Sequence, residues 1–253
     1  MKYIKGNVNL DRVALPEIPE FLNDVSVLSG NFIVSNNRLT SLKNSPKTVD
    51  MIYNCSYNPR IKSLTGCSIK VGGLNAIGCG LSSFDGFPKI ETFYSSVSNM
   101  KIVNLSNNQF TSLSGLPSIP RVRSLILSGN PLTDLTGCPS IINGDLDLAY
   151  TPLRSMINGP KEVRGNLDLN SSRIDTLEGF PTAIHGNLYL GQTPLGEKIF
   201  NSDVKKRKEL EKQILDVCNI TGGIYEDEDE YEEEHGERWI GDNPRYAEPD
   251  YDY

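Results

Sequence analysis

The chain has 253 residues, of which 38% are hydrophobic, and its 22 glycines and 15 prolines exceed the usual share of a compact domain. This composition argues against one thick core and favours a stack of short repeats, in which glycine and proline recur at turns. The formal net charge is −7. Residues 219–253 contain 13 acidic and 2 basic residues, a net −11, so the remaining chain carries +4, the difference between −7 and −11. Neither part has the basic stripe that holds a phosphate backbone, so we do not expect direct nucleic-acid binding.

The sequence shows no targeting or membrane-spanning segment. Residues 1–13 lack the apolar core of a secretory signal, and no apolar run approaches the length of about 18 residues that spans a membrane. The cysteines are odd in number and form no CxxC pair, which favours a reducing cytoplasm over a disulfide-bonded scaffold. They are Cys55, Cys67, Cys79, Cys138 and Cys218.

Self-similarity at a step close to 21 residues dominates the chain. About nine repeats can be aligned on one apolar residue, which we call the anchor. The anchors are Leu10, Val34, Cys55, Ala76, Leu105, Leu127, Leu148, Leu169 and Leu190. An apolar residue stands two positions before each anchor, and apolar residues recur five and eight positions after most of them. A proline follows twelve positions after six of the anchors.

These columns predict a solenoid. Two apolar residues at a spacing of two place their side chains on one face of a short strand, and strands of successive repeats can pair in parallel. One repeat cannot bury its apolar face alone, whereas stacked repeats share a continuous core. Proline ends the irregular return of each repeat, because it fixes φ and lacks an N–H.

A polar column lies three residues after the anchor. A buried side chain that both donates and accepts can join backbone groups of neighbouring repeats, and Asn does so with more reach than Ser or Thr. The alternative is a row of turn-favouring residues without a ladder. The column reads Asn37, Asn58, Asn108, Asn130, Thr151, Ser172 and Thr193.

The stretches LILSGNPL (125–132) and VNLSNNQF (103–110) resemble the LxLxxNxL core of leucine-rich repeats. The short period resembles the repeats of bacterial effectors, and the Gly-Asn-Leu-Asp-Leu openings are similar to repeat proteins encoded by tailed phages. Over residues 6–196 the resemblance implies an α/β-type solenoid: a horseshoe with a parallel sheet, a mostly irregular convex side and a protein-binding role. It places the protein in a host cytoplasm or a virion. The catalytic ligase domain of some effectors is not carried over, because only about 57 residues follow the repeats.

The domain boundaries follow from these patterns. Residues 1–29 form an N-terminal cap with the first repeat, and residues 30–196 hold the leucine-rich repeats. Residues 197–218 predict a C-terminal capping helix that starts at Ser202 and covers the end of the core. Its early lysines are expected on a solvated face. Residues 219–253 form an acidic tail with aromatic residues, and residues 91–101 form an insertion that either packs down or binds a partner.

The chain shows no catalytic or metal-binding constellation. The two histidines, His185 and His235, lie in different segments, and we expect His185 to be structural. No cysteine pair, histidine pair or phosphate loop has the required spacing. We therefore expect no enzymatic activity and no cofactor.

A binding surface is predicted on the outer face of the strands. The residue just before each anchor and the residue two positions earlier should point away from the core. Aspartates clustered on this face repel each other, and the fold gives little structural reason to place them together. They are interpreted either as a site for a cationic partner or as a merely solvated patch. The apolar members are explained by a partner or by β-propensity. The candidate partner-binding residues on this face are Asp145, Asp147, Asp168, Tyr189, Ile126 and Ile102.

The acidic tail is the other candidate. Trp239 and Tyr246 stand among acidic residues, which suggests a segment that folds onto a basic partner, and an inert solubilising tail is the alternative. Two functions remain open at this point. The first is a non-catalytic protein-binding scaffold, either a structural subunit or an inhibitor of a host factor. The second is an acidic competitor of nucleic acid at a basic enzyme.

Overall fold

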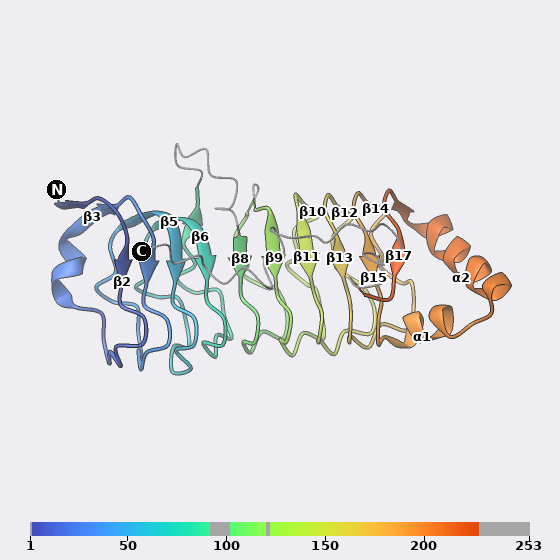
Figure 1. The fold of residues 1–253 in the computed structure, drawn as a ribbon, viewed down its shortest axis with the longest axis horizontal. Coiled ribbons are helices and arrows are strands. Elements are labelled where there is room, and N and C mark those ends of the chain that lie inside the picture. Colours follow the sequence, from blue (N-terminus) through green and yellow to red (C-terminus); the bar gives the residue numbers. More distant parts are fainter. Residues whose placement is uncertain (1, 92–101, 120–121, 228–253) are drawn as a thin grey trace.

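The computed structural model describes residues 2–91, 102–119 and 122–227. They form a parallel β-solenoid of about eight turns, in which successive coils lie side by side along one long axis (Figure 1). Residues 92–101 of the predicted insertion and the tail residues Trp239 and Tyr246 fall outside the described residues.

The main sheet runs the length of the stack and has 13 strands. Every strand pair in it is parallel, as the repeat columns predicted. Its strands are β1 (Lys2–Ile4), β2 (Val8–Asn9), β3 (Val25–Leu28), β4 (Phe32–Ile33), β5 (Thr48–Asn54), β6 (Lys70–Asn75), β7 (Lys89–Ile90), β8 (Ile102–Asn104), β9 (Ser124–Ile126), β11 (Asp145–Asp147), β13 (Leu167–Asp168), β15 (Leu188–Tyr189) and β17 (Ile224–Tyr225).

A second sheet of four parallel strands accompanies the later coils. Its strands are β10 (Ile141–Ile142), β12 (Glu162–Val163), β14 (Ala183–Ile184) and β16 (Asn219–Ile220). Each precedes the anchor strand of its coil, where the sequence predicted only irregular chain. The signal is a further apolar column six residues before the anchor, whose members Ile142, Val163 and Ile184 are all buried. Two strands per coil therefore extend the hydrogen-bonded part of the solenoid beyond the predicted single row.

The core is the continuous interior of the stack. The anchors from Val34 to Leu190 are almost fully buried, and so are the apolar residues two positions before them. Leu10, in the first coil, is only partly buried because one side of it faces the end of the stack. The predicted strand register is thus confirmed for the anchor column.

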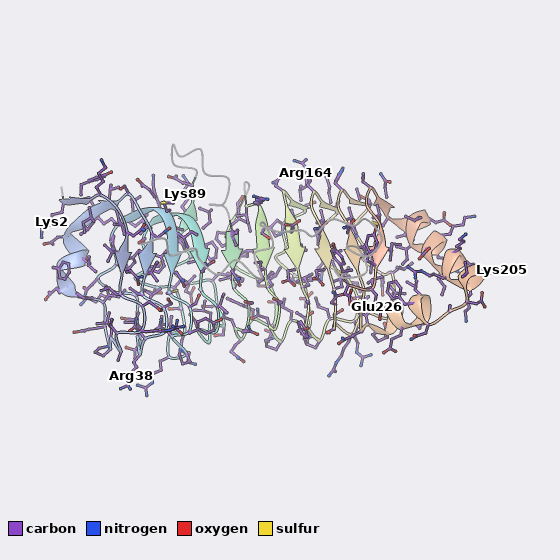
Figure 2. The ribbon with its side chains drawn as sticks, viewed as in Figure 1. Lys2, Arg38, Lys89, Arg164, Lys205 and Glu226 are labelled. Carbon is purple, nitrogen blue, oxygen red and sulfur yellow. The ribbon has the colours of Figure 1, made fainter. Side chains whose placement is uncertain are left out.

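The ends of the solenoid differ. At the N-terminal end, β1 is the edge strand of the main sheet and pairs with β3. The short helix η1 (Glu20–Asp24) directly precedes β3. At the other end, helices α1 (Pro194–Phe200) and α2 (Val204–Val217) pack together beside the last coils (Figure 1). The two ends lie far apart, with Lys2 at one and Lys205 at the other (Figure 2).

The helical segment departs from the prediction in two ways. Asp203 caps α2, because its carboxylate accepts the N–H groups of Lys205 and Lys206 at 3.0 Å each, whereas the Ser202 hydroxyl donates to the Lys198 carbonyl. The chain then returns to the stack, so that β16 and β17 extend both sheets after the helix. The helices are therefore an excursion before the last coil, and the strands continue past residue 219.

Candidate functional site

The buried asparagine ladder is present. In Asn58 the Oδ1 accepts the Leu39 N–H at 3.0 Å, while the Nδ2 donates to the carbonyls of Val34 and Cys55 at 3.0 and 2.9 Å. Val34 and Leu39 belong to the preceding coil, so one side chain holds two coils together. Equivalent bonds are made by Asn37, Asn108 and Asn130.

The ladder changes character in the later coils. The hydroxyls of Thr151 and Thr193 donate to carbonyls three residues earlier, Leu148 and Leu190, at 2.7 and 2.6 Å. These are bonds within one coil, because the Thr side chain is too short for its hydroxyl to reach the preceding coil. Coil-to-coil bonding by this column is therefore confined to the asparagine half of the stack.

The aspartates before the anchors have a structural role that the sequence analysis missed. Asp147 Oδ1 accepts the Ala149 N–H at 2.9 Å, and Asp168 Oδ1 accepts the Asn170 N–H at 2.8 Å. Asparagines in the same column make the same bond in the coils of Asn9, Asn54 and Asn104. The side chain thus closes a tight turn at the strand end, where Asp and Asn are interchangeable acceptors. The expectation that these carboxylates have little structural reason is wrong.

Asp145 belongs to a second ladder, three residues before the anchor. Its Oδ1 accepts the N–H of Asn166 at 2.8 Å, and Asn166 in turn accepts the N–H of Asn187 at 2.8 Å. Asn7 and Asn31 repeat this bond in the first coils. Burial raises the pKa of the Asp145 carboxyl, an effect that the Asn166 hydrogen bond and the charge of Arg123 oppose. Asp145 is therefore part of the coil-to-coil bonding of the fold.

The predicted outer face is less accessible than expected. Ile126 is 2% exposed and Tyr189 is 4% exposed, and Asp147 and Asp168 are also buried, while Ile102 and Asp145 are half-buried. The prediction of exposed side chains at these four positions is wrong. Part of the reason is the register: Ile126 stands between Asn104 and Asp147, and in-register neighbours at about 4.8 Å cover its flanks. Asp168 and Tyr189 are in register with each other in the same way, and the Tyr189 hydroxyl accepts a hydrogen bond from the Asn187 Nδ2.

A different row of residues faces solvent where the anchor strands end. It lies two positions after each anchor, and we call it the left-handed row because each member has a positive φ, between 53° and 68°. Its members are Arg12, Asn36, Tyr57, Gly78, Asn107, Gly129, Tyr150, Ser171 and Gln192. The backbone N–H groups of this row from Arg12 to Ser171 are bonded to the next coil, for example Tyr57 to Ile77 and Tyr150 to Asn170. The backbone conformation and the N–H bonding of the row are therefore uniform, while its side chains vary from coil to coil.

Two tyrosines stand out in this row. Glycine and asparagine adopt positive φ readily, whereas for other L-residues this region costs about 1–2 kcal/mol. Tyr57 and Tyr150 adopt this conformation despite the cost, and their side chains are 53% and 66% exposed. Strain kept at an exposed aromatic residue is a feature of functional surfaces. The sequence carried only a partial signal for this row: its column contains Asn36, Gly78, Asn107 and Gly129, but the other members are of residue types that do not favour a positive φ.

The ionisable groups elsewhere form small surface networks. Arg164 donates to Glu162 at 2.8 Å and to Asn143 at 2.8 Å, and His185 lies 3.3 Å from Glu162. The Arg164 hydrogen bond lowers the pKa of the Glu162 carboxyl. This cluster joins strands of the second sheet, on the edge opposite Arg38 in Figure 2, which fits the structural role expected of His185.

All five cysteines are free thiols. Burial raises the pKa of Cys67 and of Cys138 to about 12, and that of Cys218 to about 11. These thiols are therefore held in the protonated, unreactive form at neutral pH.

Within the described ranges, the side chains of His, Cys, Asp and Glu form no group of three that could hold a metal ion. No helix in the same part of the chain is both long and apolar enough to cross a membrane. A comparison with known proteins gives no relative: no family model, no curated protein and no solved structure matches the chain.

Proposed function

We propose that the solenoid is a leucine-rich-repeat horseshoe with a mostly irregular convex side. The LxLxxNxL columns support this assignment, because their leucines form the core and their asparagines bond adjacent coils. Helices α1 and α2 then act as the C-terminal cap, with Ile199 and Ile214 buried against the stack. The tailed-phage likeness of the Gly-Asn-Leu-Asp-Leu openings supports a phage-encoded protein that works in the host cytoplasm or in a virion.

We further propose that the protein is a non-catalytic scaffold that binds another protein, as a structural subunit or as an inhibitor of a host factor. The observation that carries this proposal is the left-handed row, in which one backbone conformation presents different side chains in successive coils. A fixed scaffold with a variable outer row is how solenoids build extended binding surfaces. The exposed Tyr57 and Tyr150 are of the residue type that anchors protein interfaces.

Affinity capture tests this function. The full chain, tagged at one terminus, is used as bait in the native cell. Captured proteins are identified by mass spectrometry. We expect one protein to be recovered in stoichiometric amount and to bind the purified chain directly. Recovery of no direct protein partner would contradict the scaffold function.

The acidic tail supports a second candidate, a competitor of nucleic acid at a basic enzyme. Its support is the net −11 of residues 219–253. A full-length variant in which the acidic residues of 226–234 are changed to their amides separates the two candidates. If the protein is a scaffold, this variant still binds its partner. If it is a charge-mimicking competitor, the partner is a nucleic-acid enzyme, the variant no longer binds it, and binding by the unaltered chain weakens strongly as salt rises.

A further inference from the structure

The middle of the left-handed row forms a shallow uncharged track. Five successive coils contribute the sequence of side chains Tyr57, Gly78, Asn107, Gly129 and Tyr150. The glycines at the second and fourth places make room for the side chains of the coil before them, and the exposed tyrosines stand at the two ends. Four coil steps separate the tyrosines, which corresponds to about 19 Å at about 4.8 Å per step.

Side chains of the track lie over its two glycines. A Cβ added at Gly78 would meet the Tyr57 ring at 3.4 Å, so this ring lies beside the glycine of the next coil. A Cβ added at Gly129 would clash with the Oδ1 of Asn107, so the Asn107 amide lies over this glycine in the same way. The side chain of Asn107, at the centre of the track, is nevertheless exposed, and its Nδ2 can donate a hydrogen bond to a ligand.

The chemistry of the track restricts what it can hold. None of its five side chains is a carboxylate or a cation, and the adjoining row one residue earlier is also uncharged, with Ser56, Ile77, Ser106, Ser128 and Ala149. These two rows offer no counter-charge to an ionic ligand such as a nucleic acid, and the Lys62 ammonium on the other side of the track lies 3.5 Å from the Pro59 carbonyl oxygen, to which it donates. Aromatic rings with a central amide suit a ligand that is apolar on one side and carries carbonyl groups.

The backbone of the track excludes strand addition. Its N–H groups bond to the next coil, as in Asn107 to Ser128 and Gly129 to Ala149. An added strand needs free backbone groups at a sheet edge, which this row does not offer. A helix needs a wide apolar groove, which the small polar floor does not offer either. A polyproline II peptide needs neither, because it has no internal backbone pairing and docks on aromatic rings.

We propose that the track binds an extended, uncharged, proline-containing peptide segment of the partner protein. This proposal rests on the protein-binding function above and names its site. At about 3.1 Å per residue, a polyproline II segment of about six residues spans the 19 Å between the tyrosines. Prolines at its two ends stack on Tyr57 and Tyr150, and a carbonyl at its centre accepts a hydrogen bond from the Asn107 amide.

The decisive variants replace tyrosine by the residue that other coils use. Asn36 and Asn107 show that asparagine fits the left-handed position. Tyr57→Asn and Tyr150→Asn therefore preserve or raise the melting temperature, while each removes one stacking ring. Gly78→Asn places a side chain against the Tyr57 ring, at a backbone position where other coils carry asparagine, and Tyr3→Asn, at an exposed tyrosine on the edge strand β1, is the matched control.

The probe is a displayed library of random peptides, selected on the full-length chain and measured afterwards as synthetic peptides by calorimetry. We expect uncharged, proline-containing sequences whose Kd rises about tenfold in each tyrosine variant and in Gly78→Asn, and is unchanged in Tyr3→Asn. Selected peptides that are charged, or that bind both tyrosine variants as tightly as the unaltered chain, overturn the proposal. The proposal is also overturned if the selection yields no peptide and the chain instead binds glycans on an array in a way that the tyrosine variants abolish. A partner that is captured by both the unaltered chain and the tyrosine variants refutes the track alone and leaves the scaffold function standing.

Discussion

The asparagine ladder makes the sharpest prediction of stability. In Asn58→Thr the shorter side chain can keep a bond to the carbonyl three residues earlier, as Thr151 does, but it cannot reach the preceding coil. The Leu39 N–H then loses its acceptor inside the core, because Asn58 is fully buried. The carbonyl of Val34 loses less, since Asn37 also donates to it at 3.0 Å.

The cost follows from the orphaned donor. A buried N–H without an acceptor costs about 1–3 kcal/mol, and the lost amide packing adds to it, so we expect about 2–3 kcal/mol. For a chain of this length each kcal/mol corresponds to about 2–4 °C, so the melting temperature should fall by about 4–12 °C. Thr151→Val, which removes one bond within a coil, should cost only about 1 kcal/mol.

Two assays test this prediction. Thermal unfolding followed by circular dichroism gives the change in melting temperature for both variants. Hydrogen exchange gives the local effect, and we expect the Leu39 amide to lose protection in Asn58→Thr and to keep it in Thr151→Val. If the two variants lose equal stability and Leu39 stays protected, the asparagine does not join the coils.

Three further predictions concern the polar ladders and the thiols. Asp147→Ala should cost about 1–3 kcal/mol by leaving the Ala149 N–H without its acceptor, whereas Asp147→Asn should be nearly neutral in the same urea titration. Because burial raises the folded-state pKa of Asp145 above its ordinary value, its charged form is disfavoured by folding, and Asp145→Asn should stabilise the chain at pH 7. This gain should disappear as the pH falls below about 4, where the carboxyl is protonated in both states, and a gain independent of pH would refute the assignment. Cys67 and Cys138 are half-buried residues whose pKa desolvation raises to about 12, so they should react with a disulfide reagent at pH 8 much more slowly in the native than in the denatured protein, and equally prompt labelling of the native protein would contradict the raised pKa.

The repeat columns predicted the fold well because the core imposes them. Leu148 and the other anchors are apolar at a fixed step, and the structure buries them in a shared interior. The same columns did not predict which side chains outside the core are accessible. Ile126 stands one residue before an anchor, yet it is almost fully buried. We expect Leu148→Asp to destabilise the chain much more than Ile126→Asp, because an aspartate at 126 can accept the N–H two residues later, as Asp147 and Asp168 do, whereas one at 148 has no such donor.

The functional surface was harder to predict, for a reason specific to polar repeats. Asp147 and Asp168 looked like a charged patch, whereas each is a hydrogen-bond acceptor for its own turn, a role that depends on backbone geometry. Tyr57 was overlooked because an exposed tyrosine is unremarkable until its backbone angle is known. Only the positive φ shows that this side chain occupies a position suited to glycine or asparagine.

Site-specific photo-crosslinking tests the central claim most directly. A photoreactive phenylalanine analogue is placed at Tyr150 in the left-handed row and, in a second variant, at Ile141, an exposed residue of the second sheet. Irradiation in the native cell should give one discrete protein adduct from Tyr150 and none from Ile141. Adducts of equal yield from both positions, or no protein adduct from Tyr150, would contradict a scaffold that binds its partner along this row.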